Sequence, residues 1–248
     1  MIHIFETKIP LYGIFFFGGM IIAAIIAFLR SKKEGVDGFD FIGAVIYVFI
    51  GAFIGAKLLF IIVSWQEIIR LKLTVLQVIQ GGFVFYGGLL GGIVGLLIYA
   101  KQFKENFFKY ADIFAIVLPL GHAFGRVGCL FAGCCYGIEY DGFGGIIYHS
   151  AVDVNTPIGI SLLPIQGIES ILLLALFLCL CILRKKVGSG KYVLSYASGY
   201  AFLRFVLEFL RGDIERGVVL GISTSQWISI GILVVVSIVM FCNLRKKH

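Results

Sequence analysis

Apolar runs long enough to cross a lipid bilayer recur along this chain and restrict its fold more than any other feature. A spanning helix needs about 20 mostly apolar residues. Runs of this kind occupy residues 11–29, 41–63, 83–100, 112–131, 164–183, 192–210 and 226–243. A chain of 248 residues that is 60% hydrophobic and 14% charged also lacks the composition of a soluble domain. We therefore predict an all-α polytopic membrane protein with seven transmembrane helices, built as a single domain over residues 1–248.

The distribution of lysine and arginine between the connecting segments predicts the orientation. One side of the membrane holds thirteen of the 21 basic residues and the other side holds five. The positive-inside rule therefore places the N-terminus outside and the C-terminus in the cytoplasm. Because this asymmetry accounts for most of the net charge of +7, the charge does not indicate a nucleic-acid partner. The thirteen are Arg30, Lys32, Lys33, Lys101, Lys104, Lys109, Arg184, Lys185, Lys186, Lys191, Arg245, Lys246 and Lys247, and the five are Lys8, Arg70, Lys72, Arg211 and Arg216.

The segment from Gly121 to Gly137 holds polar groups at a depth where a bilayer normally excludes them. It combines Arg126 and His122 with three cysteines and five glycines, directly after an apolar run. An arginine in the hydrocarbon region costs about 2.5–3.5 kcal/mol on insertion scales, so it is retained where it faces a partner, water or a ligand. A planar guanidinium with five donors suits a phosphate. We predict a phospholipid headgroup site around Arg126.

A second polar feature is a stripe along one face of the predicted helix 192–210. Tyr200, Arg204, Glu208 and Arg211 follow one another at spacings of four, four and three residues. Such residues lie on the same face of a helix. Two interpretations remain open, since Arg204 and Glu208 can neutralise one another, or the stripe can line a polar cavity. The cost of burying so many polar groups in lipid favours the cavity.

Glycines mark the second and third predicted helices. Gly51 and Gly55 form a small-x-x-x-small face, and six glycines lie within residues 81–92. Glycine lowers helix propensity by about 1 kcal/mol, so this density indicates either close helix packing or a lipid passing near the backbone. Lys57 lies within the apolar run 41–63 and is expected to extend its ammonium toward the outer surface, unless it binds substrate.

Together these residues resemble the prolipoprotein diacylglyceryl transferase family nearly from end to end. Gly125-Arg126-Val127-Gly128 matches the strongest motif of that family. The order of the matching pieces across seven predicted helices is specific, although each piece alone is weak. The other matching positions are Tyr12-Gly13, Gly55-Ala56-Lys57, Gly81-Gly82, Tyr86-Gly87-Gly88, Pro164, Gln166, Glu169, Tyr200, Arg204-Phe205, Glu208, Arg211, Asp213, Gln226 and Ser229.

The resemblance implies a transferase of the bacterial cytoplasmic membrane. Its substrates would be phosphatidylglycerol and the lipobox cysteine of a lipoprotein precursor, whose thiol receives the diacylglyceryl group. No cofactor is implied, because the lipid supplies both the transferred group and the leaving group. Arg126 and Arg204 would be catalytic and stabilise the departing phosphate. The substrate-binding residues implied are Tyr12, Lys57, Gly87, Gly88, Gln166, Glu169, Tyr200, Glu208 and Arg211.

The chain departs from the family where a base is needed. Tyr86 stands where the family has a histidine proposed to activate the thiol, and a tyrosine with a pKa near about 10 is a poor base at neutral pH. His122 is a candidate replacement, because it precedes Arg126 by four residues and shares its helical face unless the helix breaks at Gly125. We therefore assign His122 and Tyr86 as the remaining catalytic candidates.

Six cysteines are present, and three of them fall in the central segment. Cys129 and Cys134 replace the asparagine and glutamate of the family motif, and Cys135 follows. Together with His122 they could form a zinc site, since thiolate and imidazole suit that ion, but their spacing is not a Cys-x-x-Cys pair. We therefore expect no metal and reduced thiols with a packing or redox role, and a zinc site and a disulfide stay open as alternatives. The other three, which are expected to be small core residues, are Cys179, Cys181 and Cys242.

Two alternatives to the family transferase stay open at this stage. The first is a divergent relative that uses the same kind of phospholipid but a different acceptor. The second is a non-catalytic membrane protein that binds lipid or has a redox role. Tyr86 and the cysteines favour the alternatives, whereas Arg126, Arg204 and the Gln166–Glu169 segment favour the transferase.

Overall fold

The computed structural model of the chain describes residues 2–4, 7–9, 11–183, 186–213, 218–219 and 221–245. It is mostly helical, at 73%. Five basic residues that contribute to the predicted orientation lie outside the described residues, namely Arg184, Lys185, Arg216, Lys246 and Lys247. The orientation of the termini therefore stays a prediction.

Seven long helices coincide with the seven predicted runs. They are α1 (Leu11–Lys33), α2 (Gly38–Val63), α5 (Phe85–Gln102), α6 (Phe107–Ala132), α7 (Ile165–Ile182), α8 (Lys191–Leu207) and α9 (Thr224–Arg245). Among the described residues, six helices are long and apolar enough to cross a membrane, and this set omits α5. The glycines of α5, with Lys101 and Gln102 at its end, lower its mean hydropathy. A helical membrane protein is thus confirmed, whereas the seventh span stays a prediction.

Short elements occupy the connections between the long helices. The segment predicted to lie at the interface, residues 64–80, forms α3 (Trp65–Arg70) and α4 (Val75–Gln80), neither of which contains a buried residue. A 3₁₀ turn, η1 (Glu208–Leu210), follows α8 directly. The described residues also form three antiparallel strand pairs: β1 (Ile2–Ile4) with β2 (Thr7–Ile9), β3 (Ile146–Ile147) with β4 (Ser161–Leu162), and β5 (Val218–Val219) with β6 (Ile222–Ser223).

The described chain divides into two compact units, which are considered separately. The five-helix unit falls within residues 1–27, 114–186 and 191–248, and it holds α7, α8, α9 and most of α1 and α6. The glycine-rich unit comprises residues 28–113 and 187–190 and includes α2 to α5.

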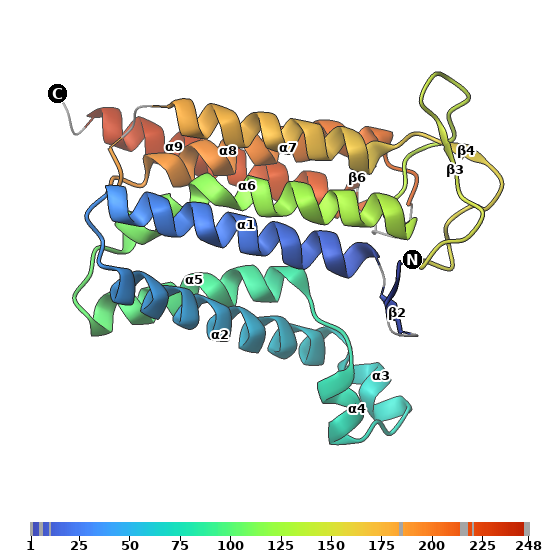
Figure 1. The fold of residues 1–248 in the computed structure, drawn as a ribbon, viewed down its shortest axis with the longest axis horizontal. Coiled ribbons are helices and arrows are strands. Elements are labelled where there is room, and N and C mark those ends of the chain that lie inside the picture. Colours follow the sequence, from blue (N-terminus) through green and yellow to red (C-terminus); the bar gives the residue numbers. More distant parts are fainter. Residues whose placement is uncertain are drawn as a thin grey trace. The chain divides into compact units, whose positions relative to one another are not determined.

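In the five-helix unit, α8 packs against both α7 and α9 (Figure 1). Helix α6 joins α7 through a hydrogen bond that the Ser170 hydroxyl donates to the Ala123 carbonyl at 3.0 Å. Helix α1 packs on α6 where Gly19 meets Phe124, and any side chain at Gly19 would overlap that ring. The core of this unit is therefore built where small residues let the helices approach.

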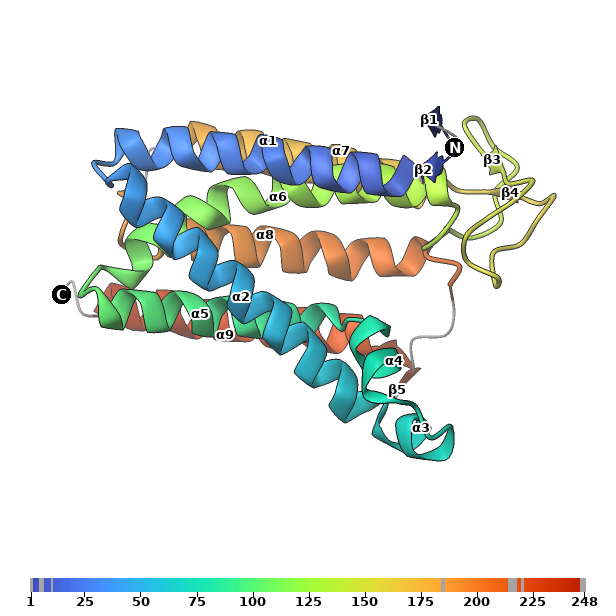
Figure 2. The same ribbon diagram turned by 60° about the horizontal axis from the view of Figure 1, so that its bottom comes forward.

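In the glycine-rich unit, α2 and α5 cross at close range through their glycines (Figure 2). A Cβ atom at Gly55 would overlap the Gly87 carbonyl oxygen, and one at Gly51 would overlap the Gly91 carbonyl oxygen. Only glycine permits backbones to approach so closely. The close-packing interpretation of this glycine-rich sequence is confirmed.

The expectation that Cys179, Cys181 and Cys242 are core residues is wrong. All three are exposed on their helices. Lipid tails are as apolar as a protein core, so a membrane helix can be apolar on every face. The hydrophobicity of a run therefore does not distinguish core positions from outward-facing ones.

Candidate active site

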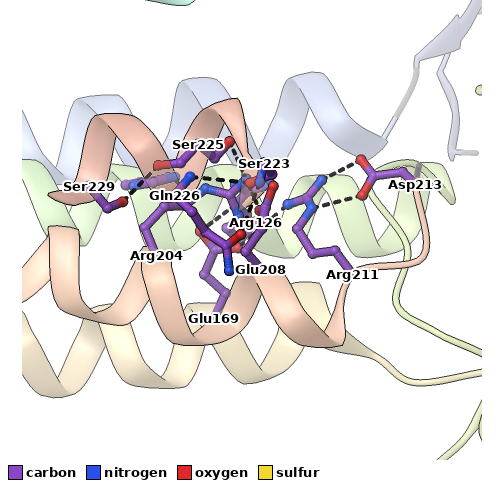
Figure 3. A network of polar contacts seen from close by, with 11 residues as sticks. Arg126, Glu169, Arg204, Glu208, Arg211, Asp213, Ser223, Ser225, Gln226 and Ser229 are labelled. Atoms are coloured by element: carbon purple, nitrogen blue, oxygen red, sulfur yellow. Dashed lines mark hydrogen bonds and ion pairs between the residues drawn. The ribbon is translucent and has the colours of Figure 1, made fainter. Parts of the chain in front are cut away.

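A network of three arginines and three carboxylates lies inside the five-helix unit (Figure 3). Arg126 of α6 places its Nε atom 3.0 Å from Glu169 Oε1 of α7. Arg204 of α8 places Nη2 2.5 Å from Glu208 Oε2. The third pair, Arg211 with Asp213, is bidentate, with Nε donating to Oδ1 at 2.8 Å and Nη2 to Oδ2 at 2.5 Å.

Glu169 connects two of the arginines. Its second oxygen lies 4.0 Å from Arg211 Nη1, while its first faces Arg126. The Glu169 and Arg211 side chains are each only 3% exposed. Three guanidinium groups and three carboxylates balance in charge, which reduces the cost of burying them at membrane depth. The predicted stripe does not lie on one helix, because α8 ends at Leu207 and Arg211 follows η1 in extended conformation. Arg204 and Glu208 are nevertheless not an isolated pair, since Arg211 approaches Glu169 of α7, which in turn faces Arg126 of α6.

The arginines keep donors that no described residue satisfies. Arg126 Nε is buried and lies 3.0 Å from Glu169 Oε1, but it forms no hydrogen bond to that atom. Arg204 Nη1 and Arg211 Nη1 are also buried and have no hydrogen-bond partner among the described residues. Each guanidinium has five donors in a fixed fork. Buried donors without partners are costly unless a ligand or water satisfies them. The network is therefore suited to accept an anionic oxygen ligand.

Helix α9 supplies contacts that the sequence did not predict. Arg204 Nη2 donates to the Ser225 hydroxyl at 3.1 Å, and the Ser229 hydroxyl donates to the Ser225 carbonyl at 2.9 Å. Gln226 caps the N-terminal end of α9, because its side-chain oxygen accepts a hydrogen bond from the Ser223 amide at 3.0 Å. The polar cluster at residues 223–226 was the signal that could have identified Ser225.

His122 lies beside the network as its spacing predicts. Helix α6 runs without a break through Gly125, so His122 and Arg126 share one face. His122 Nε2 is 3.9 Å from Glu169 Oε1, and its ring centroid is 5.2 Å from that of Tyr200. The predicted geometry is confirmed, while the role as base stays a prediction.

Three thiols gather next to the network. The Sγ atoms of Cys129, Cys134 and Cys135 all lie within 4.8 Å of one another, and we call this group the thiol cluster. All six cysteines of the chain are free thiols. Hydrogen bonds with Cys129 and Cys134, helped by the positive charges of Arg126 and Arg211, hold the pKa of the Cys135 thiol well below its usual range. The sequence left open whether Cys129 meets the other two, and the structure brings the three together.

The remaining predicted residues of the five-helix unit surround these groups. Tyr12 packs on the motif glycine Gly128, whose substitution would bring a Cβ atom within 3.1 Å of the Tyr12 ring. Tyr200 stacks on Tyr196 with 5.9 Å between ring centroids. Gln166 is buried and donates through Nε2 to the Cys134 carbonyl at 2.7 Å.

Four predicted residues belong to the glycine-rich unit. The Lys57 ammonium donates to the carbonyls of Val78, Gly81 and Gly82 at 3.1, 3.0 and 3.0 Å. These three carbonyls therefore match the three N–H donors of the ammonium. It also lies 4.0 Å from the centroid of the Phe83 ring. The contacts with the carbonyls cap the C-terminal end of α4. The other three are Gly87 and Gly88, which face α2, and Tyr86, which is 43% exposed at the start of α5.

Comparison with known proteins agrees with this arrangement. The profile of the family described as prolipoprotein diacylglyceryl transferase matches residues 1–242. The chain is 37% identical over 233 residues to phosphatidylglycerol–prolipoprotein diacylglyceryl transferase 2 of Clostridium perfringens, covering 94% of this chain and 90% of that protein. Its identity to the transferase of Clostridium tetani is 36% over 237 residues, covering 95% and 93%. A Dehalococcoides mccartyi transferase is 31% identical over 240 residues, covering 96% and 90%. The chain therefore belongs to the prolipoprotein diacylglyceryl transferase family.

Proposed function

We propose that this protein transfers the diacylglyceryl group of phosphatidylglycerol to the cysteine thiol of lipoprotein precursors. The family membership and the names of the relatives support this activity. The observation that carries it is the group of buried guanidinium nitrogens of Arg126, Arg204 and Arg211 that form no hydrogen bond within the described part of the chain. The enzyme acts in the bacterial cytoplasmic membrane, where both the lipid and the precursor are available.

The arginines act on the phosphate of the lipid. The acceptor sulfur attacks the glyceryl carbon that bears the phosphate ester, and negative charge develops on the departing glycerol phosphate. Arg126 and Arg204 stabilise this charge as it forms, because their carboxylate partners already hold them in place. Such preorganisation avoids the reorganisation that water would need. Glu169, Glu208 and Arg211 position these two groups.

The other assigned residues contact the lipid or the acceptor. Tyr12 and Tyr200 donate hydrogen bonds near the headgroup, and Gln166 orders the segment that contains Cys134. His122 accepts the thiol proton, with Tyr86 as the rival candidate. Lys57, Gly87 and Gly88 complete the predicted substrate-binding set, although their observed contacts support helix packing and the capping of α4.

The proposed membrane topology has seven spanning helices in one domain over residues 1–248. The N-terminus is outside and the C-terminus is in the cytoplasm. The coincidence of α5 with a predicted run supports the seventh span, and the excess of basic residues on one side supports the orientation.

Complementation tests the activity. The host's own transferase is depleted, the chain is expressed, and lipidated precursor is detected by its shift on gels and by mass spectrometry. We expect growth and lipidation with the wild type and neither with Arg126→Ala at equal membrane abundance. Normal expression of the wild type without lipidated precursor would reject the proposal.

A second candidate is transfer from the same lipid to a different acceptor. Tyr86 and the thiol cluster favour it, since Tyr86, Cys129 and Cys134 depart from the residues of the family motifs. Purified protein, phosphatidylglycerol vesicles and a lipobox peptide separate the two. Release of glycerol phosphate that requires a small thiol but not the peptide would support the second candidate.

A further inference from the structure

The thiol cluster occupies a turn at the end of α6. Cys129 lies in the last turn of the helix, while Cys134 and Cys135 follow its end at Ala132. None of the three side chains is fully buried. An ion or an acceptor can therefore reach the sulfur atoms without unfolding the unit.

The turn is held in place by buried polar groups. The Gly133 carbonyl accepts from the hydroxyl of buried Thr156 at 2.5 Å, and the Cys134 carbonyl accepts from Gln166 at 2.7 Å. The Cys134 amide donates to the Cys129 carbonyl at 3.2 Å, which brings the two thiols to one side. Cys135 has a φ of +56°, a left-handed conformation that costs a non-glycine residue about 1 kcal/mol or more. The surrounding structure thus holds the backbone of the turn in place, and the cysteine side chains can still rotate.

We propose that Cys129, Cys134 and Cys135 bind one Zn²⁺ ion through three thiolates. Zinc–sulfur bonds of about 2.3 Å in a tetrahedral site place neighbouring sulfur atoms about 3.8 Å apart. The observed sulfur atoms lie within 4.8 Å of one another, so small rotations of the side chains close the site. Thiolates select zinc over hard cations such as Mg²⁺.

The charge around the cluster fits this ion. Three thiolates with one Zn²⁺ carry a net charge of −1. The positive charge of Arg211 acts on the Cys135 thiol, and the backbone bridge between Gly137 and Arg211 holds the two segments together. Arg126 lies one turn before Cys129 on the same helix. Each of these guanidinium groups already faces a carboxylate, and each also places positive charge beside the anionic zinc site.

A disulfide accounts for the cluster less well. Disulfides join residues whose Cα atoms are usually 4.4–6.8 Å apart, whereas adjacent residues such as Cys134 and Cys135 are separated by about 3.8 Å. A bond between these two would close a strained eight-membered ring, so the unstrained choice is a bond from Cys129 to one of them. Any single disulfide would leave the third thiol unused. Zinc uses all three.

The zinc site would bind the acceptor thiol of the reaction, and this role rests on the proposed transferase function. Catalytic zinc sites keep three protein ligands and an open fourth position, and a coordinated thiol is deprotonated. The acceptor cysteine would take the fourth position and pass its proton to His122, the base assigned under the proposed function. Its sulfur then donates an electron pair to the glyceryl carbon as the carbon–oxygen bond breaks, and both electrons of that bond leave with glycerol phosphate. Zinc keeps its oxidation state, and the neutral thioether dissociates as a weak ligand.

Metal content tests the site independently of activity. Full-length protein in detergent is equilibrated with zinc, passed through a desalting column and analysed by elemental mass spectrometry. We expect one zinc per chain for the wild type and loss of bound zinc in Cys129→Ser, Cys134→Ser and Cys135→Ser. The matched control replaces the outward-facing Cys179, Cys181 and Cys242 by serine, and it should keep the full content.

Cadmium provides a second measurement that does not depend on stoichiometry alone. Its thiolate charge-transfer absorption should appear with the wild type and the control and be absent in each cluster variant. Zinc should also raise the melting temperature of the wild type but not of Cys135→Ser. Equal zinc content in all variants, or a disulfide from Cys129 in natively alkylated protein, would overturn the proposal.

The acceptor role has its own measurement. A strong chelator should reduce transfer to a lipobox peptide by at least 10-fold, and zinc should restore it. If zinc binds stoichiometrically and transfer does not change on its removal, the acceptor role is overturned. Failure of the transferase function itself would appear as no transfer in any metal state, while the zinc content would still decide the site.

Discussion

Arg126 is the single residue on which the phosphate chemistry depends most. We expect Arg126→Lys to reduce transfer nearly as much as Arg126→Ala, by about 100-fold or more, because one ammonium cannot replace a planar fork of donors. The measurement is kcat/KM with phosphatidylglycerol vesicles and a lipobox peptide. Arg70→Lys on exposed α3 is the matched control and should retain activity. A fully active Arg126→Lys enzyme would contradict the phosphate role.

His122 and Tyr86 compete for the role of base, and their variants separate them. If His122 accepts the thiol proton, His122→Ala should slow transfer most at low pH, since a thiol with a pKa near about 8.5 is then least ionised. Tyr86→His should recover part of that loss by restoring the family residue. The measurement is the pH profile of kcat.

The opposite result would be equally clear. A silent His122→Ala with an inactive Tyr86→Phe would make Tyr86 the acting group and His122 a packing residue beside Tyr200. If both variants are silent while Arg126→Ala is inactive, positioning and charge stabilisation carry the reaction without a side-chain base.

At the scale of elements, the crossing of α2 and α5 depends on individual glycines. Gly91→Ala should destabilise the glycine-rich unit by about 1–3 kcal/mol, because its Cβ atom would overlap the Gly51 carbonyl oxygen and the backbones must separate. Gly88→Ala on the same helix is the control, since its Cβ atom would lie 3.5 Å from its nearest neighbours, an ordinary contact. Thermal unfolding in detergent measures both. Equal melting temperatures would show that the crossing can relax.

At the scale of the whole molecule, the topology can be tested with reporter fusions. A fluorescent protein at the C-terminus should fluoresce and alkaline phosphatase there should be inactive, because the positive-inside rule places that end in the cytoplasm. A phosphatase fused after Arg70 should be active, since that connection lies outside in a seven-span arrangement. An inactive phosphatase at Arg70 with a cytoplasmic C-terminus would reject the proposed order of spans.

The sequence determined the positions of the helices and the identity of their polar residues. Each long helix falls on a predicted apolar run, because the length needed to cross a bilayer is a local property of the chain. The shared face of His122 and Arg126 and the packing role of Gly55 also followed from helical spacing alone.

Only the tertiary structure decided which helix faces meet. Glu169 as the partner of Arg126, Ser225 beside Arg204 and the meeting of Cys129 with Cys134 all depend on contacts between separate segments or on a turn after a helix. The outward position of Cys179 could not be predicted either, since lipid and core are equally apolar. Helical periodicity fixes where a side chain points on its own helix, but the partner it meets is fixed by how the helices pack.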